Sequence, residues 1–166
     1  DMEVEGLLHA SAVRSKYPRA RVLSIDTEKA KAVPGIVDIF TAADIPGDVK
    51  VGHLVQDWDT MIPVGSITHY LGDAIALVVG ENLDVVEKAK KLVKVEYEEL
   101  PFVSSPYEAM KEDAPQVHGS GNLLAHKHVS RGNAKEAIAN AKYVYTEEFH
   151  TPWTEHAFLE PECAIA

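Results

Sequence analysis

Four histidines late in the chain come closest, by type and spacing, to a metal site. His126 and His128 stand two positions apart, and residues two apart on a strand share one of its faces. The others, His150 and His156, bracket a Pro-Trp turn with glutamates nearby. A zinc site needs three or four convergent ligands, and the chain has no H-E-x-x-H motif and no C-x-x-C pair. Solvent-facing strand histidines are therefore the favoured interpretation, with a small His-based metal-binding protein as the alternative. The remaining histidines stand alone, which favours surface or loop positions: His9, His53, His69 and His118.

The single cysteine, Cys163, is the candidate nucleophile. It is predicted to lie in an apolar strand beside Glu160 and Glu162, and both features disfavour the thiolate. A buried, inert cysteine is therefore favoured. The chain has no G-x-S-x-G motif and no Gly-rich phosphate loop, and Glu98 and Glu99 point to opposite faces of a predicted strand. Residue chemistry alone thus predicts no self-sufficient active site.

The elements that must position these side chains follow a mixed α and β pattern, which predicts the α+β class, a mixed sheet with about three or four helices packed on it. Strands are predicted at 21–25, 36–41, 74–80, 94–99, 123–130 and 142–150, and helices at 28–33, 83–93, 106–110 and 134–141. Residues 48–72 are irregular and predict a loop with two brief strands. The succession strand, helix, strand over 74–99 is typical of a β-α-β unit.

Two asparagines mark predicted helix starts. Asn82 precedes the clearest helix, whose apolar residues form one stripe. Asn133 is followed three positions later by Glu136, which is the spacing of a capping box.

Composition limits the class of protein. The chain has 166 residues, 46% of them hydrophobic and 25% charged, with a net charge of −10. That charge argues against nucleic-acid binding, which requires a basic face. The longest apolar run, 75–79, is far shorter than the ~20 residues that span a bilayer, so no membrane partner is expected. With one cysteine and no segment resembling a signal peptide, a cytoplasmic location is expected.

An ordered set of segments carries a family resemblance over nearly the whole chain. The segments are G-L-L-H-A-S-A-V-R-S (6–15), S-I-D (24–26), V-P-G-I-V-D-I-F-T-A-A-D-I-P-G (33–47), Y-L-G-D-A-I-A-L-V-V-G-E (70–81), V-E-Y-E-E-L-P (95–101) and T-E-H-A-F-L-E-P-E (154–162). Together they resemble the N-terminal portion of the large, molybdenum-binding subunit of xanthine dehydrogenases and aldehyde oxidases. Departures occur at Leu71-Gly72-Asp73, where many relatives have Gly-Gln, and at Thr154, where many have Gln.

This resemblance implies an α/β-hammerhead domain, followed in the full subunit by domains that hold molybdopterin. It implies that the full enzyme hydroxylates a purine, another N-heterocycle or an aldehyde carbon with water-derived oxygen. Electrons would leave through iron–sulfur clusters and, in many members, FAD. The family's Gly-rich segment at molybdenum, its late acidic base and its cluster-binding cysteines have no counterpart here. No catalytic, cofactor-binding or metal-binding residue of the family is therefore carried over to this chain.

The resemblance also implies a domain organisation. We expect a hammerhead domain at 1–150 and, at 151–166, the first strand of a truncated molybdopterin-binding domain. The last fourteen residues, 153–166, stop in mid-pattern, as expected of a fragment. The expected partners are the remaining molybdopterin domains of the same subunit and iron–sulfur and flavin subunits or domains. The fragment would act as a scaffold or docking domain and be inactive alone; a non-catalytic interaction module is the alternative.

Overall fold

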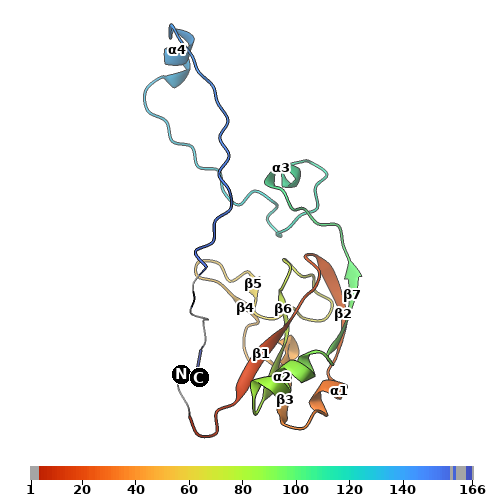
Figure 1. Cartoon of the computed structure of the whole chain (residues 1–166). Coiled ribbons are helices and arrows are strands. Elements are labelled where there is room, and N and C mark those ends of the chain that lie inside the picture. Colours follow the sequence, from red (N-terminus) through yellow and green to blue (C-terminus); the bar gives the residue numbers. More distant parts are fainter. Residues whose placement is uncertain (1–3, 158, 160–163, 166) are drawn as a thin grey trace. The chain divides into compact units, whose positions relative to one another are not determined.

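The apolar run at 74–80 forms β6 (Ala74–Gly80), the central strand of the largest sheet (Figure 1). The structure, a computed structural model, describes residues 4–157, 159, 164 and 165. The chain divides into two units, 1–124 and 125–166.

Strand β6 lies between β1 (His9–Arg14) and β3 (Ile36–Thr41), and both pairings are antiparallel. Because both edges of β6 are hydrogen-bonded and both of its faces are covered, its side chains are buried or half-buried throughout. This explains why its sequence is almost continuously apolar.

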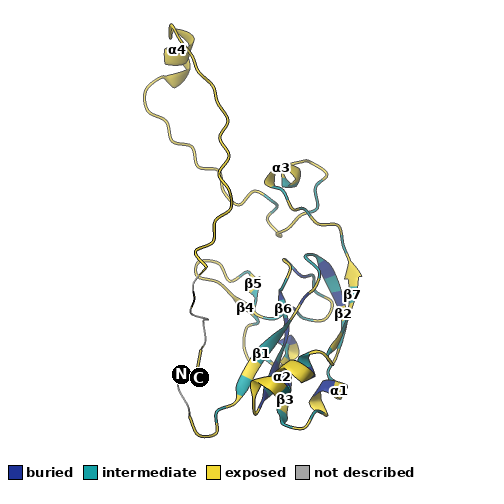
Figure 2. Cartoon of the chain, viewed as in Figure 1, coloured by how far each residue is buried: buried dark blue, intermediate teal, exposed yellow. Residues whose placement is uncertain are grey.

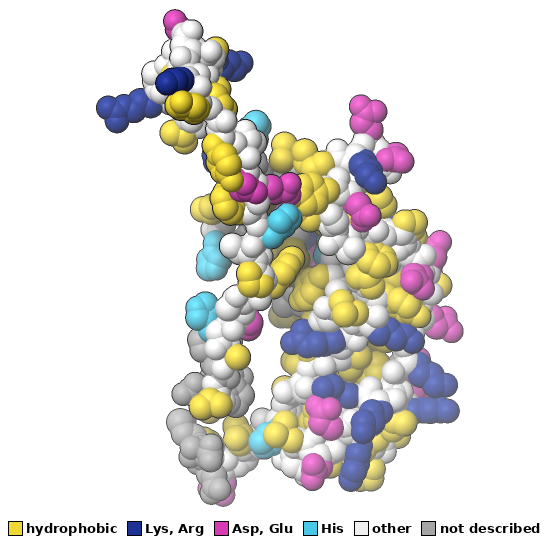
Figure 3. Space-filling model, turned by 45° about the horizontal axis from the view of Figure 1, so that its top comes forward, with side chains coloured by type: hydrophobic (Ala, Val, Ile, Leu, Met, Phe, Trp, Pro, Cys, Tyr) yellow, Lys and Arg dark blue, Asp and Glu magenta, His cyan; other side chains and the backbone are white. Residues whose placement is uncertain are grey.

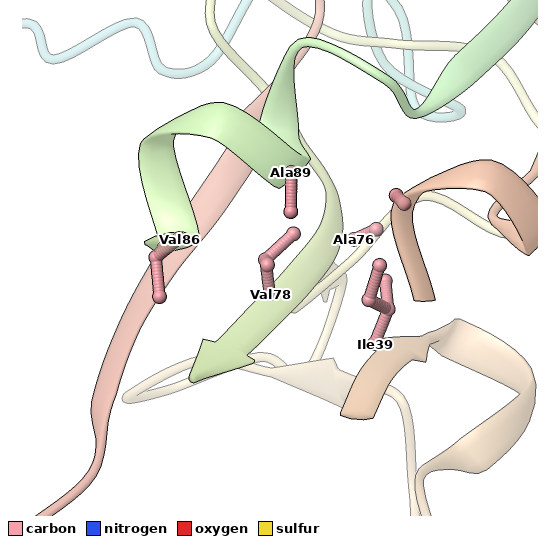
Figure 4. Packing of buried hydrophobic residues seen from close by; sticks show 6 residues of the cluster. Ile39, Ala76, Val78, Val86 and Ala89 are labelled. Carbon is pink, nitrogen blue, oxygen red and sulfur yellow. The ribbon is translucent and has the colours of Figure 1, made fainter. Parts of the chain in front are cut away.

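One face of the three-stranded sheet packs against two helices, α1 (Glu28–Lys31), which lies against β3, and α2 (Leu83–Lys90), which lies against β6. The side chains of Val78 and Ala89 point toward one another across this interface (Figure 4). The stripe predicted from the sequence therefore forms the main core, although α2 ends three residues earlier than predicted. The buried cluster consists of Ala30, Ile39, Ala76, Val78, Val86 and Ala89.

The other side of the core forms a second, smaller cluster. Ile75 of β6 is buried with Val22 and Ile62. Val22 belongs to β2 (Ala20–Asp26), which pairs antiparallel with β7 (Lys94–Glu99) in a separate two-stranded sheet.

The predicted β-α-β unit is wrong. Strand β7 follows α2 but pairs with β2 and not with the sheet that contains β6. The physical reason is that β1 and β3 already occupy both edges of β6. All the strand pairs in the described part of the chain are antiparallel, and they form three small sheets.

The two brief strands predicted within 48–72 are present as β4 (Lys50–Val51) and β5 (Trp58–Asp59), which pair antiparallel. Upstream of them, the 3₁₀ turn η1 (Ala42–Asp44) follows β3. The Asp44 carboxylate accepts hydrogen bonds from Thr41 N (2.7 Å) and Thr41 Oγ1 (2.9 Å). These bonds favour the ionised form and lower the pKa of Asp44.

Helix α3 (Pro106–Ala109) begins with Pro106 at its first position, as predicted. The loop that follows is organised by Asn122. Its Nδ2 donates to Ala109 O (2.8 Å) and Pro115 O (3.1 Å), and its Oδ1 accepts from Val117 N (2.7 Å). Three bonds from one side chain thus close the loop on itself.

Among its described residues, the second unit contains one helix, α4 (Ala134–Ala139). Asn133 accepts from Glu136 N and donates to its carboxylate, which confirms the predicted start of this helix. The strands predicted at 123–130 and 142–150 are wrong, since these segments carry no strand pairing. An alternating pattern needs a partner strand, and the described residues offer none. Most side chains of this unit are exposed (Figure 2).

The α+β class is confirmed, with four short α-helices and three small sheets in the portion of the chain that the structure describes. Among the α-helices, α1 and α2 contribute buried residues to the core, whereas α3 and α4 bury none. Across the described ranges, no helix has the length and apolarity required to cross a membrane.

Replacing Asn82 with alanine is expected to destabilise the 1–124 unit by about 1 kcal/mol. The Asn82 side chain accepts from Val85 N at 3.0 Å and so satisfies one of the free donors at the start of α2. Urea denaturation, monitored by circular dichroism, measures the change in the free energy of unfolding. The matched control is Asn133→Ala: it removes the same kind of cap from α4, which buries nothing, so the midpoint should stay unchanged. Equal effects of the two variants would contradict the assigned role of α2.

Candidate functional site

A histidine and a buried aspartate form the most constrained polar pair of the first unit. Asp73 is only 2% exposed and precedes β6 directly. Its Oδ2 accepts from His69 N at 2.8 Å and lies 3.3 Å from His69 Nδ1. The four-residue spacing folds the chain into a tight loop, whose turn uses Gly72 at a φ of 99°.

The His69 ring is held from two further sides. Its Nε2 lies 4.0 Å from Asp59 Oδ2, and the Trp58 ring lies 5.5 Å away between ring centroids. Trp58 also stacks on Tyr70 at 5.7 Å. The brief strand β5 therefore positions an aromatic and an acidic side chain against the loop that carries His69.

Next to His69 lies a groove of about 360 Å³. Its walls come from four segments that are distant in sequence: 18–19, 67–69, 102–103 and 115–119. The lining contains one arginine, two histidines and several apolar side chains, and no aspartate or glutamate.

The wall at 115–119 is fixed to the β4–β5 segment by His118. Its Nε2 lies 3.0 Å from Asp57 Oδ2, and its Nδ1 lies 2.7 Å from Ser120 Oγ. Both ring nitrogens are therefore engaged. Together with the bonds of Asn122, this contact gives the groove a defined rim.

The sequence placed His69 and His118 in loops, which is confirmed, but treated them as isolated, which is wrong. Only one of them leaves a local signal. His69 has its aspartate four residues on, in T-H-Y-L-G-D, whereas the aspartate that pairs with His118 lies 61 residues away.

The four histidines singled out by spacing are not brought into a metal site. His126 and His128 are exposed and do not lie on a strand, so the shared face assumed for them does not exist. His150 pairs with Glu148 at 3.0 Å on the surface, and the backbone N–H of His156 donates to the carboxylate of its neighbour, Glu155. Within 4–157 and the few later residues described, no three His, Cys, Asp or Glu side chains are arranged to hold a metal ion. Cys163 lies outside the described residues.

The described part of the chain contains no site that matches molybdopterin, the cofactor implied by the family resemblance. An orphaned buried polar side-chain atom would indicate a missing partner, but every such atom described here has a hydrogen-bond partner. The His69–Asp73 pair is satisfied internally, and no nucleophilic side chain lines the groove beside it except Thr68, whose hydroxyl is hydrogen-bonded to Ala20 N. The described residues of the site carry no complete catalytic set.

The family model described as "Aldehyde oxidase and xanthine dehydrogenase, a/b hammerhead domain" matches residues 1–101, which is more than half of the 166 residues. The chain belongs to this family. The hammerhead fold implied by the resemblance is thereby confirmed, and the matched range includes all three sheets of the first unit.

Relatives in bacteria match this hammerhead chain over its whole length. The xanthine dehydrogenase molybdenum-binding subunit of Escherichia coli O157:H7 is 33% identical over 100% of the chain and 23% of the relative. The nicotinate dehydrogenase large molybdopterin subunit of Eubacterium barkeri is 31% identical over 100% of the chain and 39% of the relative. The chain therefore spans well under half the length of these relatives.

Solved structures agree with this assignment. The aldehyde oxidoreductase of Desulfovibrio gigas matches with a TM-score of 0.73 and 27% identity, over 85% of this chain and 16% of that one. Quinoline 2-oxidoreductase from Pseudomonas putida 86 matches with a TM-score of 0.67 and 28% identity, over 86% of this chain and 19% of that one.

Proposed function

We propose that this chain is the scaffolding or docking domain of a molybdenum hydroxylase large subunit and that it is inactive alone. The observation that carries the proposal is the match of the entire chain to a minor share of much longer proteins, such as 23% of the molybdenum-binding relative in Escherichia coli. Its described residues form a packed core and a ligand-sized groove, but they include no cluster of three or more His, Cys, Asp or Glu side chains that could hold a metal ion.

The proposed activity of the full protein is hydroxylation of a purine, N-heterocycle or aldehyde carbon with water-derived oxygen. Molybdenum–molybdopterin would supply that chemistry, with iron–sulfur clusters and FAD as the electron path. These groups would belong to the remaining molybdopterin domains and to iron–sulfur and flavin partners. A cytoplasmic location is part of the same proposal.

We also propose the domain limits 1–150 for the hammerhead and 151–166 for the first strand of the next domain. The family match ends at 101 and the first unit at 124, so both lie inside the proposed hammerhead range. The segment 151–166 falls partly on residues that are not described.

A docking role is favoured by the apolar side chains of the second unit. Val129, Tyr143, Phe149 and Trp153 are all more than four-fifths exposed. Figure 3 shows apolar side chains standing uncovered along this unit. Exposed apolar side chains in such number are typical of a surface that another polypeptide covers.

The purified chain is expected to show no turnover of xanthine, hypoxanthine, nicotinate or benzaldehyde, since we find no complete catalytic set among its described residues. The assay follows reduction of an artificial electron acceptor, with an intact xanthine dehydrogenase as the positive control. Turnover by the chain without added subunits would contradict the proposed role.

A further inference from the structure

The groove beside His69 has a chemical character that scaffolding does not explain. We propose that it binds a small carboxylic acid with an apolar or aromatic body, and that Arg19 pairs with the carboxylate. The chain carries 26 acidic residues and a net charge of −10, yet none of the groove's lining residues is acidic. The charge of this lining therefore favours an anionic ligand over a cationic one.

Arg19 supplies the charge. Its Nη1 donates to Pro101 O at 2.8 Å, which fixes the guanidinium beside the groove. No carboxylate in the described part of the chain forms an ion pair with it, whereas Arg21 pairs with Glu98 at 3.3 Å. A guanidinium has five N–H donors in a planar fork, so the bond to Pro101 leaves donors for a bidentate carboxylate.

The apolar body of the ligand would contact the remaining walls. Ile67, Phe102, Val103 and Val117 line the groove, and Phe102 and Val117 are each about half exposed. The volume of about 360 Å³ lies at the lower end of the range for small-molecule sites, ~300 to 1,000 Å³. An acid of one aromatic ring suits this space better than a dinucleotide or a large cofactor.

The two histidines leave the groove open to an anion. His118 and His69 hold the oxygens of Asp57 and Asp73, and neither aspartate lines the groove. One ring nitrogen of each histidine is thus engaged by the carboxylate of a residue that does not line the groove.

The test is a titration of the ¹⁵N-labelled 166-residue chain with benzoate and with benzamide, which have the same shape and differ in charge. We expect amide shifts at 102–103 and 115–119, and binding of benzoate about tenfold tighter than that of benzamide, because a charge-assisted hydrogen bond adds at least the free energy of one decade in Kd. Equal affinities, or no shift at these residues with either compound, would overturn the proposal.

Variants then locate the charge. Arg19→Gln should abolish the preference for benzoate, and Arg19→Lys should retain part of it. The matched control is Arg14→Gln, because Arg14 also donates to a backbone carbonyl, Gly72 O at 2.9 Å, but does not line the groove. A benzoate preference that survives in Arg19→Gln would refute the role of Arg19. If that variant fails to fold, the comparison of the two compounds on the unmodified chain still decides whether the site exists.

Discussion

Replacing Ile39 with alanine is expected to lower the free energy of unfolding of the first unit by about 3 kcal/mol, within the 2–5 kcal/mol typical of buried isoleucine. Ile39 is 2% exposed and lies in β3, where it packs in the cluster that joins the three-stranded sheet to α1 and α2. Alanine removes three carbon atoms from this cluster. The short helices have few other buried residues with which to refill the space.

Urea denaturation of both proteins measures this effect. The control is Val37→Ala in the same strand, because Val37 is 55% exposed and its truncation should cost less than about 0.5 kcal/mol. A loss below 1 kcal/mol for Ile39→Ala, or similar losses for the two variants, would show that the cluster does not hold the unit together.

The second large effect is expected at Asp73. Asp73→Ala should destabilise the first unit by about 2 kcal/mol, because it leaves His69 N without an acceptor in a half-buried loop. It should also loosen the contact between the Trp58 and His69 rings, whose centroids lie 5.5 Å apart. Tryptophan fluorescence of the folded state reports this second change.

Two substitutions isolate the cause. Asp73→Asn keeps an oxygen acceptor and should lose less than half as much stability as Asp73→Ala. Asp57→Asn alters an exposed pair with His118 and should change stability by no more than about 0.5 kcal/mol. If Asp57→Asn proved as harmful as Asp73→Ala, burial would not be what makes the His69–Asp73 pair important.

Local signals in the sequence predicted most of the first unit. The apolar run of β6, the alternation in β2 and β7, and the cap at Asn82 each depend on neighbours within a few positions, and each is confirmed. The pairing of β7 with β2 was not predictable in this way. It depends on which sheet edges are already filled, and 72 residues separate Ser24 from its hydrogen-bond partner Glu96.

In the second unit, a local sequence pattern led to a wrong prediction. Residues 142–150 alternate as a strand does, yet the described structure gives them no pairing. An alternating pattern indicates that a segment is suited to a half-buried sheet, but it does not guarantee that a neighbouring strand is present to pair with it. The prediction of the candidate site failed because it also depends on contacts between distant residues. His118 and Asp57 are 61 positions apart, so only the folded chain brings them together.

The family assignment and the site geometry lead to one picture of this chain. The hammerhead match and the packed first unit support the proposed role of the chain as a scaffolding domain. The groove at Arg19 adds a place where such a domain would meet a small acid.

We propose above all that the chain scaffolds a molybdenum enzyme without binding its cofactor. The most direct test is the molybdenum and pterin content of the 166-residue chain, purified from cells that make molybdopterin and measured by elemental analysis and pterin fluorescence. We predict that neither molybdenum nor pterin exceeds the background of an unrelated protein purified in the same way. Stoichiometric molybdenum and pterin that co-elute with the chain would contradict the claim.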